Sequence, residues 1–274
     1  MIVSDRHRFV FVHIPKCAGV SVKSLLRPID DSKGSFSRIA EHPVLGKTHY
    51  AHLSVQDLAA HFADTYAKLR AYRSVALVRD PVDRFVSSVF QRMREFKGYA
   101  QSAITPAAFA AEARTVTRHL ASNRGRLTLE YVHFQRQSEF VLEDGEQVVS
   151  RIFRLDQLDL AAEFIAECTG VHIETDDRLN RSTELRSGRL QPVVRVLRIP
   201  YARLIPLGIR QQIRSAMHQS GLYGEVDKDR FVRPNGELST FLKDYYRDDF
   251  VLFAEAWRPA HGVVASHQDG LCAV

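Results

Sequence analysis

Two segments of the chain share one hydropathy pattern, an apolar run followed by a turn and then by helical spacing. Residues 9–14 are apolar apart from one histidine, and their aromatic and β-branched side chains predict a buried strand. Pro15 ends that strand, and apolar residues then recur at helical spacing, at Val22, Leu25 and Leu26. A second apolar run at 75–78 precedes Pro81, a residue that favours the first position of a helix. The pattern predicts two strand–turn–helix units.

The remainder of the chain also alternates between strand and helix patterns. A buried strand is predicted at 148–155, and helices are predicted at 54–66, 107–120, 156–169 and 237–257. Ser54 and Asp57 have the spacing of a capping box. Residues 1–8 have the composition of a polar lead-in, and 28–46 that of a loop bordering a binding site. This alternation indicates an α/β protein with a central parallel sheet and helices on both faces.

Size and composition are those of a soluble globular protein. The chain has 274 residues, of which 45% are hydrophobic and 26% charged, and we expect one domain at 1–259 with a loose tail at 260–274. No apolar segment has membrane-spanning length, so we expect no transmembrane segment. Peripheral contact with a membrane stays open. Cysteines without CxxC or metal spacing (Cys17, Cys168 and Cys272) favour a reducing compartment, and we expect a cytoplasmic protein.

The first turn has the composition of an anion cradle. Lys16 ends the strand, small residues follow, and the helix begins near Gly19. The N–H groups of the first helical turn, the positive end of the helix dipole and the Lys16 ammonium then converge on one point. The turn differs from a Walker A loop, because there the lysine follows the last glycine. A surface lysine that caps a turn is the alternative.

The second turn carries an arginine and a serine. Arg79 stands at the carboxyl end of its strand, and Ser87 lies eight residues further on, about two turns into the helix. The alternatives are an ion pair of Arg79 with Asp80 or Asp83, and a serine merely tolerated within a helix.

Together the two turns resemble the sulfotransferase family, in its membrane-Golgi-like or carbohydrate branch, with the motifs I-P-K-x-x-G-x-S and R-D-P-x-x-R-F-x-S. The resemblance implies a P-loop-kinase-like fold and the donor phosphoadenosine phosphosulfate (PAPS). It implies that the donor's 3′-phosphate is held by Arg79 and Ser87. Its 5′-phosphosulfate would be held by the first turn, at Lys16, Cys17, Ala18, Gly19, Val20 and Ser21. Weaker correspondences are Arg181 and Ser182, in a turn that closes over the nucleotide.

The first turn departs from the family pattern at three positions. Cys17, Ala18 and Val20 stand where the family usually has Thr or Ser, Gly and Thr. Val20 removes a hydroxyl that would contact the phosphate, so a weaker or altered phosphate grip is expected. Cys17 is interpreted as a small space-filling residue, with an activated thiolate as the alternative.

A histidine base is expected between the two turns. His49 and His52 directly precede the helix that opens at Ser54, and the resemblance favours His52, with His49 as the runner-up. A near-neutral imidazole suits removal of the proton from an acceptor hydroxyl that attacks sulfur in line. Lys16 would then neutralise charge on the leaving phosphate. His13 is interpreted as a hydrogen-bonded core histidine.

The resemblance continues more weakly along the chain. His133, Gln137 and Val141 match an H-x-x-x-Q-x-x-x-[LV] element, residues 145–158 match a second one, and 237–257 resembles a closing Y-x-x-D-[FY]-x-L-[FY] helix. The C-terminal R-K-G-x-x-G-D-W-K box of cytosolic small-molecule sulfotransferases is absent from the sequence. This favours the carbohydrate branch, in a bacterial member or a trimmed domain.

The implied reaction is transfer of a sulfuryl group from PAPS to a hydroxyl of a carbohydrate or glycolipid. No metal is expected, because the sulfuryl group carries less charge than a phosphoryl group and no acidic pair is placed as a metal site. Two alternatives stay open. One is a P-loop-type nucleotide or small-molecule kinase, which would need magnesium and ATP. The other is a non-catalytic PAPS- or glycan-binding protein. The acceptor and the oligomeric state are not predicted.

The stretch 178–214 is rich in arginine, within a chain of net charge +6. The favoured interpretation is an ordinary solvated face of the protein. The second is a groove that binds an anionic glycan or a phospholipid-linked sugar. Nucleic-acid binding is ranked last and not expected, because aromatic residues are not interleaved as a stacking platform requires.

Overall fold

The computed structural model describes residues 1–100, 103–123, 125–173, 183–185, 223–225, 231 and 236–256. The chain divides into two compact units, which we describe one at a time. The first consists of Met1–Pro81, Arg136–Ile173 and Tyr246–Val274, and the second of Val82–Gln135 and Glu174–Tyr245. The described residues include eight α-helices and a central mixed sheet of four strands. The predicted α/β class is therefore confirmed, and the P-loop-kinase-like fold stays a prediction.

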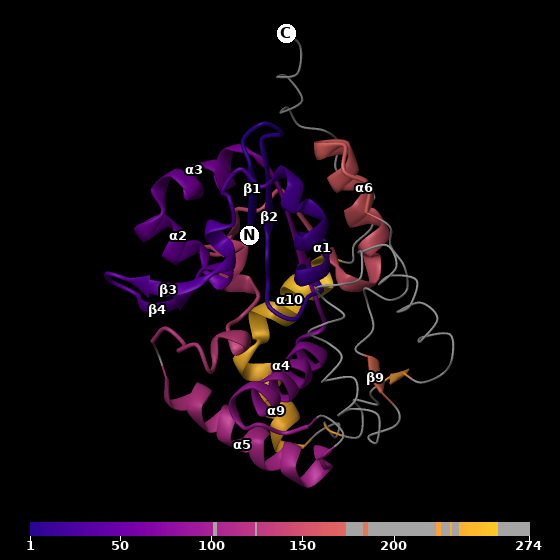
Figure 1. Cartoon of the computed structure of the whole chain (residues 1–274). Coiled ribbons are helices and arrows are strands. Elements are labelled where there is room, and N and C mark those ends of the chain that lie inside the picture. The colour runs from indigo at the N-terminus through magenta and orange to yellow at the C-terminus, as the bar shows by residue number, and fades with distance from the viewer. Residues whose placement is uncertain are drawn as a thin grey trace, which may run out of the picture. The chain divides into compact units, whose positions relative to one another are not determined.

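The first unit is built on that four-stranded sheet (Figure 1). Its strands, in spatial order, are β1 (Ile2–Ser4), β2 (Phe9–Val12), β5 (Arg73–Val78) and β8 (Arg151–Arg154). β2, β5 and β8 are parallel, as predicted. Every residue of β2 and all but the first of β5 are buried, which explains their continuous apolar runs.

The parallel-sheet prediction is wrong for the edge strand. β1 pairs antiparallel with β2, and the residues read as a polar lead-in include the buried Ile2 and Val3. An antiparallel neighbour needs only a tight turn, and the polar residues 5–8 make that turn. The apolar run of β1 is three residues long, which is too short to show a period in the sequence.

The segment between β2 and β5 contains several short elements. α1 (Gly19–Leu26) is followed by η1 (Arg27–Ile29), η2 (Ser35–Ser37) and the hairpin of β3 (Ile39–His42) and β4 (Gly46–His49). Next come η3 (Tyr50–His52), α2 (Val55–His61) and α3 (Ala63–Ala71). The predicted capping box is confirmed by reciprocal bonds between Ser54 and Asp57. The predicted single helix at 54–66 is instead two helices, because Phe62 has the non-helical φ of −138°.

Two further parts complete the first unit. η6 (Ser138–Phe140), the hairpin of β6 (Leu142–Glu143) and β7 (Glu146–Gln147), and η7 (Leu155–Gln157) flank β8. α6 (Leu158–Thr169) packs against β5 and β8 and ends at Gly170, whose φ is 70°. α10 (Arg247–Glu255) contacts η6 through Asp249, which is fully buried. The Asp249 carboxylate accepts the N–H groups of Gln137 and Ser138 at 2.8 and 2.9 Å.

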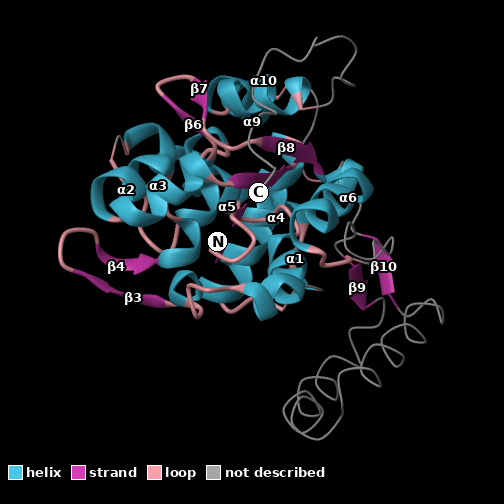
Figure 2. Ribbon diagram, turned by 90° about the horizontal axis from the view of Figure 1, so that it is seen from above, coloured by secondary structure: helices cyan, strands magenta, loops and turns pink. Residues whose placement is uncertain are grey.

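Most of the described residues of the second unit belong to helices. The unit contains α4 (Pro81–Phe96), α5 (Pro106–Ser122), η5 (Val132–Phe134), the paired strands β9 (Thr183–Leu185) and β10 (Tyr223–Glu225), and α9 (Glu237–Tyr245). Of these, α4, α5 and α9 are labelled in Figure 1 and in Figure 2. The rings of Phe90, Phe109 and Phe231 form one cluster. The buried Arg84 donates to the carbonyls of His133 and Gln135, which ties α4 to the chain around η5.

Two boundary predictions have different outcomes. The predicted closing helix 237–257 is broken at Tyr246 into α9 and α10, which belong to different units. One domain at 1–259 stays a prediction, and the tail 260–274 lies outside the described residues.

The buried Asp249 generates a prediction about stability. Asp249→Ala should lower the free energy of unfolding by about 3 kcal/mol, because two buried N–H groups lose their acceptor. Urea denaturation measures this change. The matched control is Asp248→Ala, which removes an exposed carboxylate from the same helical turn and should cost about 0.5 kcal/mol. Equal losses in the two variants would contradict the assignment.

Candidate functional site

The turn after β2 has an unusual backbone conformation. Lys16 and Ala18 have φ values of 68° and 54°, in the left-handed region that side chains other than glycine rarely adopt. The Ala18 carbonyl accepts the N–H groups of Ser21 and Val22 at 3.1 and 3.4 Å, so α1 begins directly after it. The first N–H groups of a helix have no acceptor within the helix. The turn therefore presents backbone donors and a half-buried lysine at one place.

Arg79 follows β5 at the same edge of the sheet as this turn, because β2 and β5 are parallel neighbours. Its Nη1 donates to the Lys16 carbonyl at 3.3 Å, and the residue is 7% exposed. The structure thus brings together two of the sequence-predicted site residues, which are 63 positions apart.

Gln137 joins the turn and the strand end. Its side-chain amide receives the Arg79 N–H and donates to the Arg79 carbonyl, both at 2.9 Å. The same oxygen accepts the Cys17 thiol at 3.3 Å, and Gln137 is fully buried. Because its own N–H donates to Asp249, Gln137 also ties this site to α10. From the sequence, Gln137 is predicted only as part of the H-x-x-x-Q motif and not as a site residue. The spacing of that motif is the signal that points to it.

Cys17 is a packing residue in this arrangement. It is 1% exposed, and besides Gln137 its thiol contacts the Pro15 carbonyl at 3.6 Å. A buried, hydrogen-bonded thiol of this kind agrees with the space-filling interpretation.

Three histidines lie in a row beside the turn. The ring centroids of His49 and His52 are 4.2 Å apart, and those of His52 and His13 are 5.0 Å apart. His13 and His52 are buried, whereas His49 is half-buried. A Cβ on Gly19 would lie 2.0 Å from Cδ2 of His13, so glycine is required for this close approach. The core interpretation of His13 accounted for its burial but missed its position between His52 and the start of α1.

The surroundings of His49 favour the neutral form of its imidazole. Its Nδ1 accepts the Ala51 N–H at 3.3 Å, which leaves the proton of the neutral ring on Nε2. Burial lowers the pKa of His49 below its ordinary value of 6.5, and the positive charge of Lys23 lowers it further. Lys23 itself donates to the Phe36 carbonyl at 2.9 Å. Both histidines therefore remain candidate bases. The neutral form that a base needs is favoured for His49. The ring of His52 contacts His13, which in turn packs against Gly19 of the turn.

The other predicted residues differ in exposure and in the unit to which they belong. Val20 is 74% exposed and Ser21 half-exposed, both on the first turn of α1. Ser87 is half-exposed on α4 of the second unit. Its neighbour Ser88 is buried and donates to the carbonyls of Arg84 and His133, each at 2.9 Å. Ser88 therefore has a structural role, and Ser87 is the serine of this pair that reaches the surface. Arg181, Ser182 and most of 178–214 lie outside the described residues.

The first unit is an α/β arrangement in which a lysine turn, a helix amino end and an arginine meet at the carboxyl edge of parallel strands. The sequence profile of the Sulfotransferase family matches residues 1–254. The chain therefore belongs to the sulfotransferase family, and its reaction class is sulfuryl transfer. Neither the comparison with curated proteins nor that with solved structures finds a significant match.

Within 1–173 and the later described segments, no group of three His, Cys, Asp or Glu side chains is placed to hold a metal ion. No helix in the described part of the chain combines the length and apolarity needed to cross a bilayer.

The histidine row generates a prediction about titration. We expect His49 to titrate below pH 6.5, and Lys23→Gln to raise its pKa because a nearby positive charge is removed. Nuclear magnetic resonance of the histidine ring protons measures both values. Since folding favours the neutral ring, the stability that His49 contributes is present above pH 6.5 and is lost as the pH falls through its folded-state pKa. An unchanged His49 pKa in Lys23→Gln would contradict this electrostatic account.

Proposed function

We propose that the protein transfers a sulfuryl group from PAPS to a hydroxyl of a carbohydrate or glycolipid acceptor. Membership of the sulfotransferase family supports the reaction class. The observation that carries the donor assignment is the meeting of Lys16 and Arg79 at the amino end of α1. Two cationic side chains and helix N–H groups suit a ligand with phosphate groups at both ends of a nucleotide.

The donor would use the two turns differently. Residues 16–21 would hold the 5′-phosphosulfate, through the backbone of the turn and the side chains of Lys16 and Ser21. Arg79 and Ser87 would hold the 3′-phosphate, and Arg181 and Ser182 would close over the nucleotide. The exposed side chain of Val20 has no hydroxyl, so the grip relies on backbone donors and Lys16.

The reaction needs one bond exchange and one proton transfer. The acceptor oxygen attacks sulfur, the bond from sulfur to the 5′-phosphate oxygen breaks, and His52 takes the hydroxyl proton. Lys16 stabilises the negative charge that gathers on the leaving phosphate. His13 packs between Gly19 and His52, so it would fix the base relative to the donor turn. None of these steps calls for a metal ion.

The resemblance of the motifs supports an acceptor of the carbohydrate branch. The net charge of +6 also suits binding of an anionic glycan. The loop 28–46, which contains η2 and β3 and leads into β4, precedes the candidate bases and would border the acceptor.

Donor binding is the first functional prediction. Adenosine 3′,5′-bisphosphate, the spent donor, should raise the melting temperature without magnesium. Arg79→Ala should weaken its binding at least about tenfold, because a charge-assisted contact is lost. The matched control is Arg73→Ala at the other end of β5, where an exposed arginine pairs with Glu167 at 3.6 Å. Ser87→Ala should also weaken binding, whereas Ser88→Ala should instead lower the melting temperature of the unliganded protein.

The outcomes of this titration separate the alternatives. A response to magnesium–ATP alone would overturn the proposal in favour of a kinase. No response to either nucleotide would remove the donor site altogether. Binding of the bisphosphate without turnover on any acceptor would favour the non-catalytic binding protein.

The base assignment is tested by turnover. With radiolabelled PAPS and a mixture of neutral and acidic oligosaccharides, His52→Ala should reduce transfer by about 10²- to 10⁴-fold. Its affinity for adenosine 3′,5′-bisphosphate should be unchanged, which controls for folding. His49→Ala should have the smaller effect. The reverse order would assign the base to His49.

A further inference from the structure

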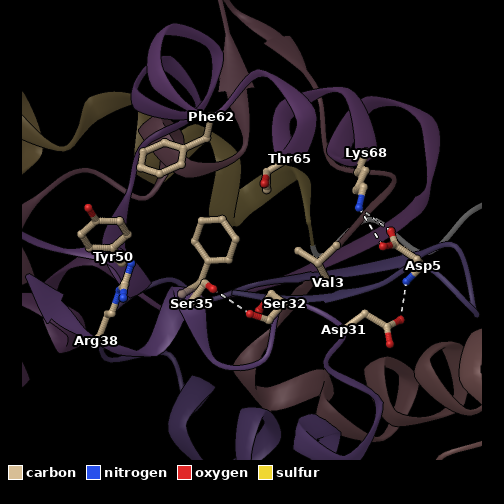
Figure 3. A pocket seen from close by; sticks show the side chains of 11 residues that line it. Val3, Asp5, Asp31, Ser32, Ser35, Arg38, Tyr50, Phe62, Thr65 and Lys68 are labelled. Atoms are coloured by element: carbon tan, nitrogen blue, oxygen red, sulfur yellow. Dashed lines mark hydrogen bonds and ion pairs between the residues drawn. The ribbon is translucent and has the colours of Figure 1, made fainter. Parts of the chain in front are cut away.

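A pocket of about 280 Å³ lies in the first unit (Figure 3). It is formed by β1, the segment 31–38, Tyr50 of η3, and the chain that leads into α3. This volume is just below the usual range for small-molecule sites, about 300–1,000 Å³, so the pocket suits a small ligand. The pocket is not lined by any of the residues assigned to the donor or to the base.

The walls at one end and in the middle are aromatic. Phe36 and Tyr50 are 6% and 8% exposed, and their rings contact Phe62 with centroids 6.0 and 5.7 Å apart. Both contacts have edge-to-face geometry, which holds the three rings against one another. These rings offer apolar surface to a flat ring of a ligand.

The Tyr50 end of the pocket carries a positive charge. The Arg38 guanidinium lies 5.3 Å from the centre of the Tyr50 ring. Among the described residues, no carboxylate lies within ion-pair distance of Arg38. A guanidinium that stacks on an aromatic face keeps the donors at its edge for a planar anion, which it binds through two parallel hydrogen bonds.

The opposite end carries charges of both signs and is rich in hydrogen-bond acceptors. Lys68 pairs with Asp5 at 2.7 Å, so these two charges cancel. The remaining carboxylate, Asp31, accepts the N–H groups of Arg6 and Asp5, and these hydrogen bonds hold its pKa below the ordinary value. Figure 3 shows Arg38 and Tyr50 at one end and Lys68, Asp5 and Asp31 at the other. The second end can therefore accept a hydrogen bond from a ligand.

We propose that this pocket binds a small molecule with a flat ring, an anionic oxygen group at one end and a hydroxyl group at the other. The anion binds Arg38, the ring packs against the exposed edges of the aromatic cluster of Tyr50, Phe36 and Phe62, and the hydroxyl donates toward Asp31. The site does not depend on the proposed sulfuryl transfer, because it shares no residue with the donor turn.

The probe is 4-hydroxybenzoate, and its control is 4-hydroxybenzamide, which has the same shape and no charge. Calorimetry with the full chain should give saturable binding of the acid with a dissociation constant of about 1 mM or tighter, and at least about tenfold weaker binding of the amide. Arg38→Gln should remove this preference. The matched control is Arg70→Gln, since Arg70 is an exposed arginine of α3 that pairs with Glu143 outside the pocket.

Three results would overturn the proposal: no saturable binding of the acid, equal binding of acid and amide, or equal losses in Arg38→Gln and Arg70→Gln. Titration with adenosine 3′,5′-bisphosphate keeps the two sites apart. Arg38→Gln should retain bisphosphate binding, and Arg79→Ala should retain 4-hydroxybenzoate binding. A failure of the donor proposal would thus leave this result intact.

Discussion

The side-chain amide of Gln137 is the interaction on which the site depends. Its oxygen receives the Arg79 N–H and the Cys17 thiol, while its nitrogen donates to the Arg79 carbonyl. One amide thus holds the end of β5 beside the turn after β2. Gln137 is itself held by the carboxylate of Asp249. Because these polar groups are buried, loss of a hydrogen-bond partner from any of them would lower the free energy of unfolding.

The turn that this network supports has little freedom to change. Two residues other than glycine have positive φ, and the His13 ring closes on Gly19 so tightly that no Cβ fits. Backbone strain of this kind persists where the surroundings determine the conformation from several sides. Here the surroundings are β2, the Gln137 amide and the histidine row. The turn is therefore organised before any ligand arrives, which reduces the ordering cost of binding an anion.

Prediction from the sequence succeeded where the signal was local. The strands β2 and β5, the helices that follow them and the capping box of α2 are each specified within about ten residues. It failed where a neighbour decided the outcome. β1 is too short to show a period and becomes a strand by pairing with β2. The helical patterns at 54–66 and 237–257 continue through Phe62 and Tyr246, yet the backbone leaves helical geometry at both positions.

The sequence by itself determined the class of protein and the candidate donor residues, because Lys16 and Arg79 each stand at the end of a strand that its own pattern predicts. Parallel pairing then brings such ends to one edge of the sheet. Only the tertiary structure decided what surrounds them. Gln137 and Asp249 are 112 positions apart, and the pocket at Arg38 joins the edge strand to α3. Contacts at such separations leave no periodic trace in the sequence, since they arise from how the elements pack.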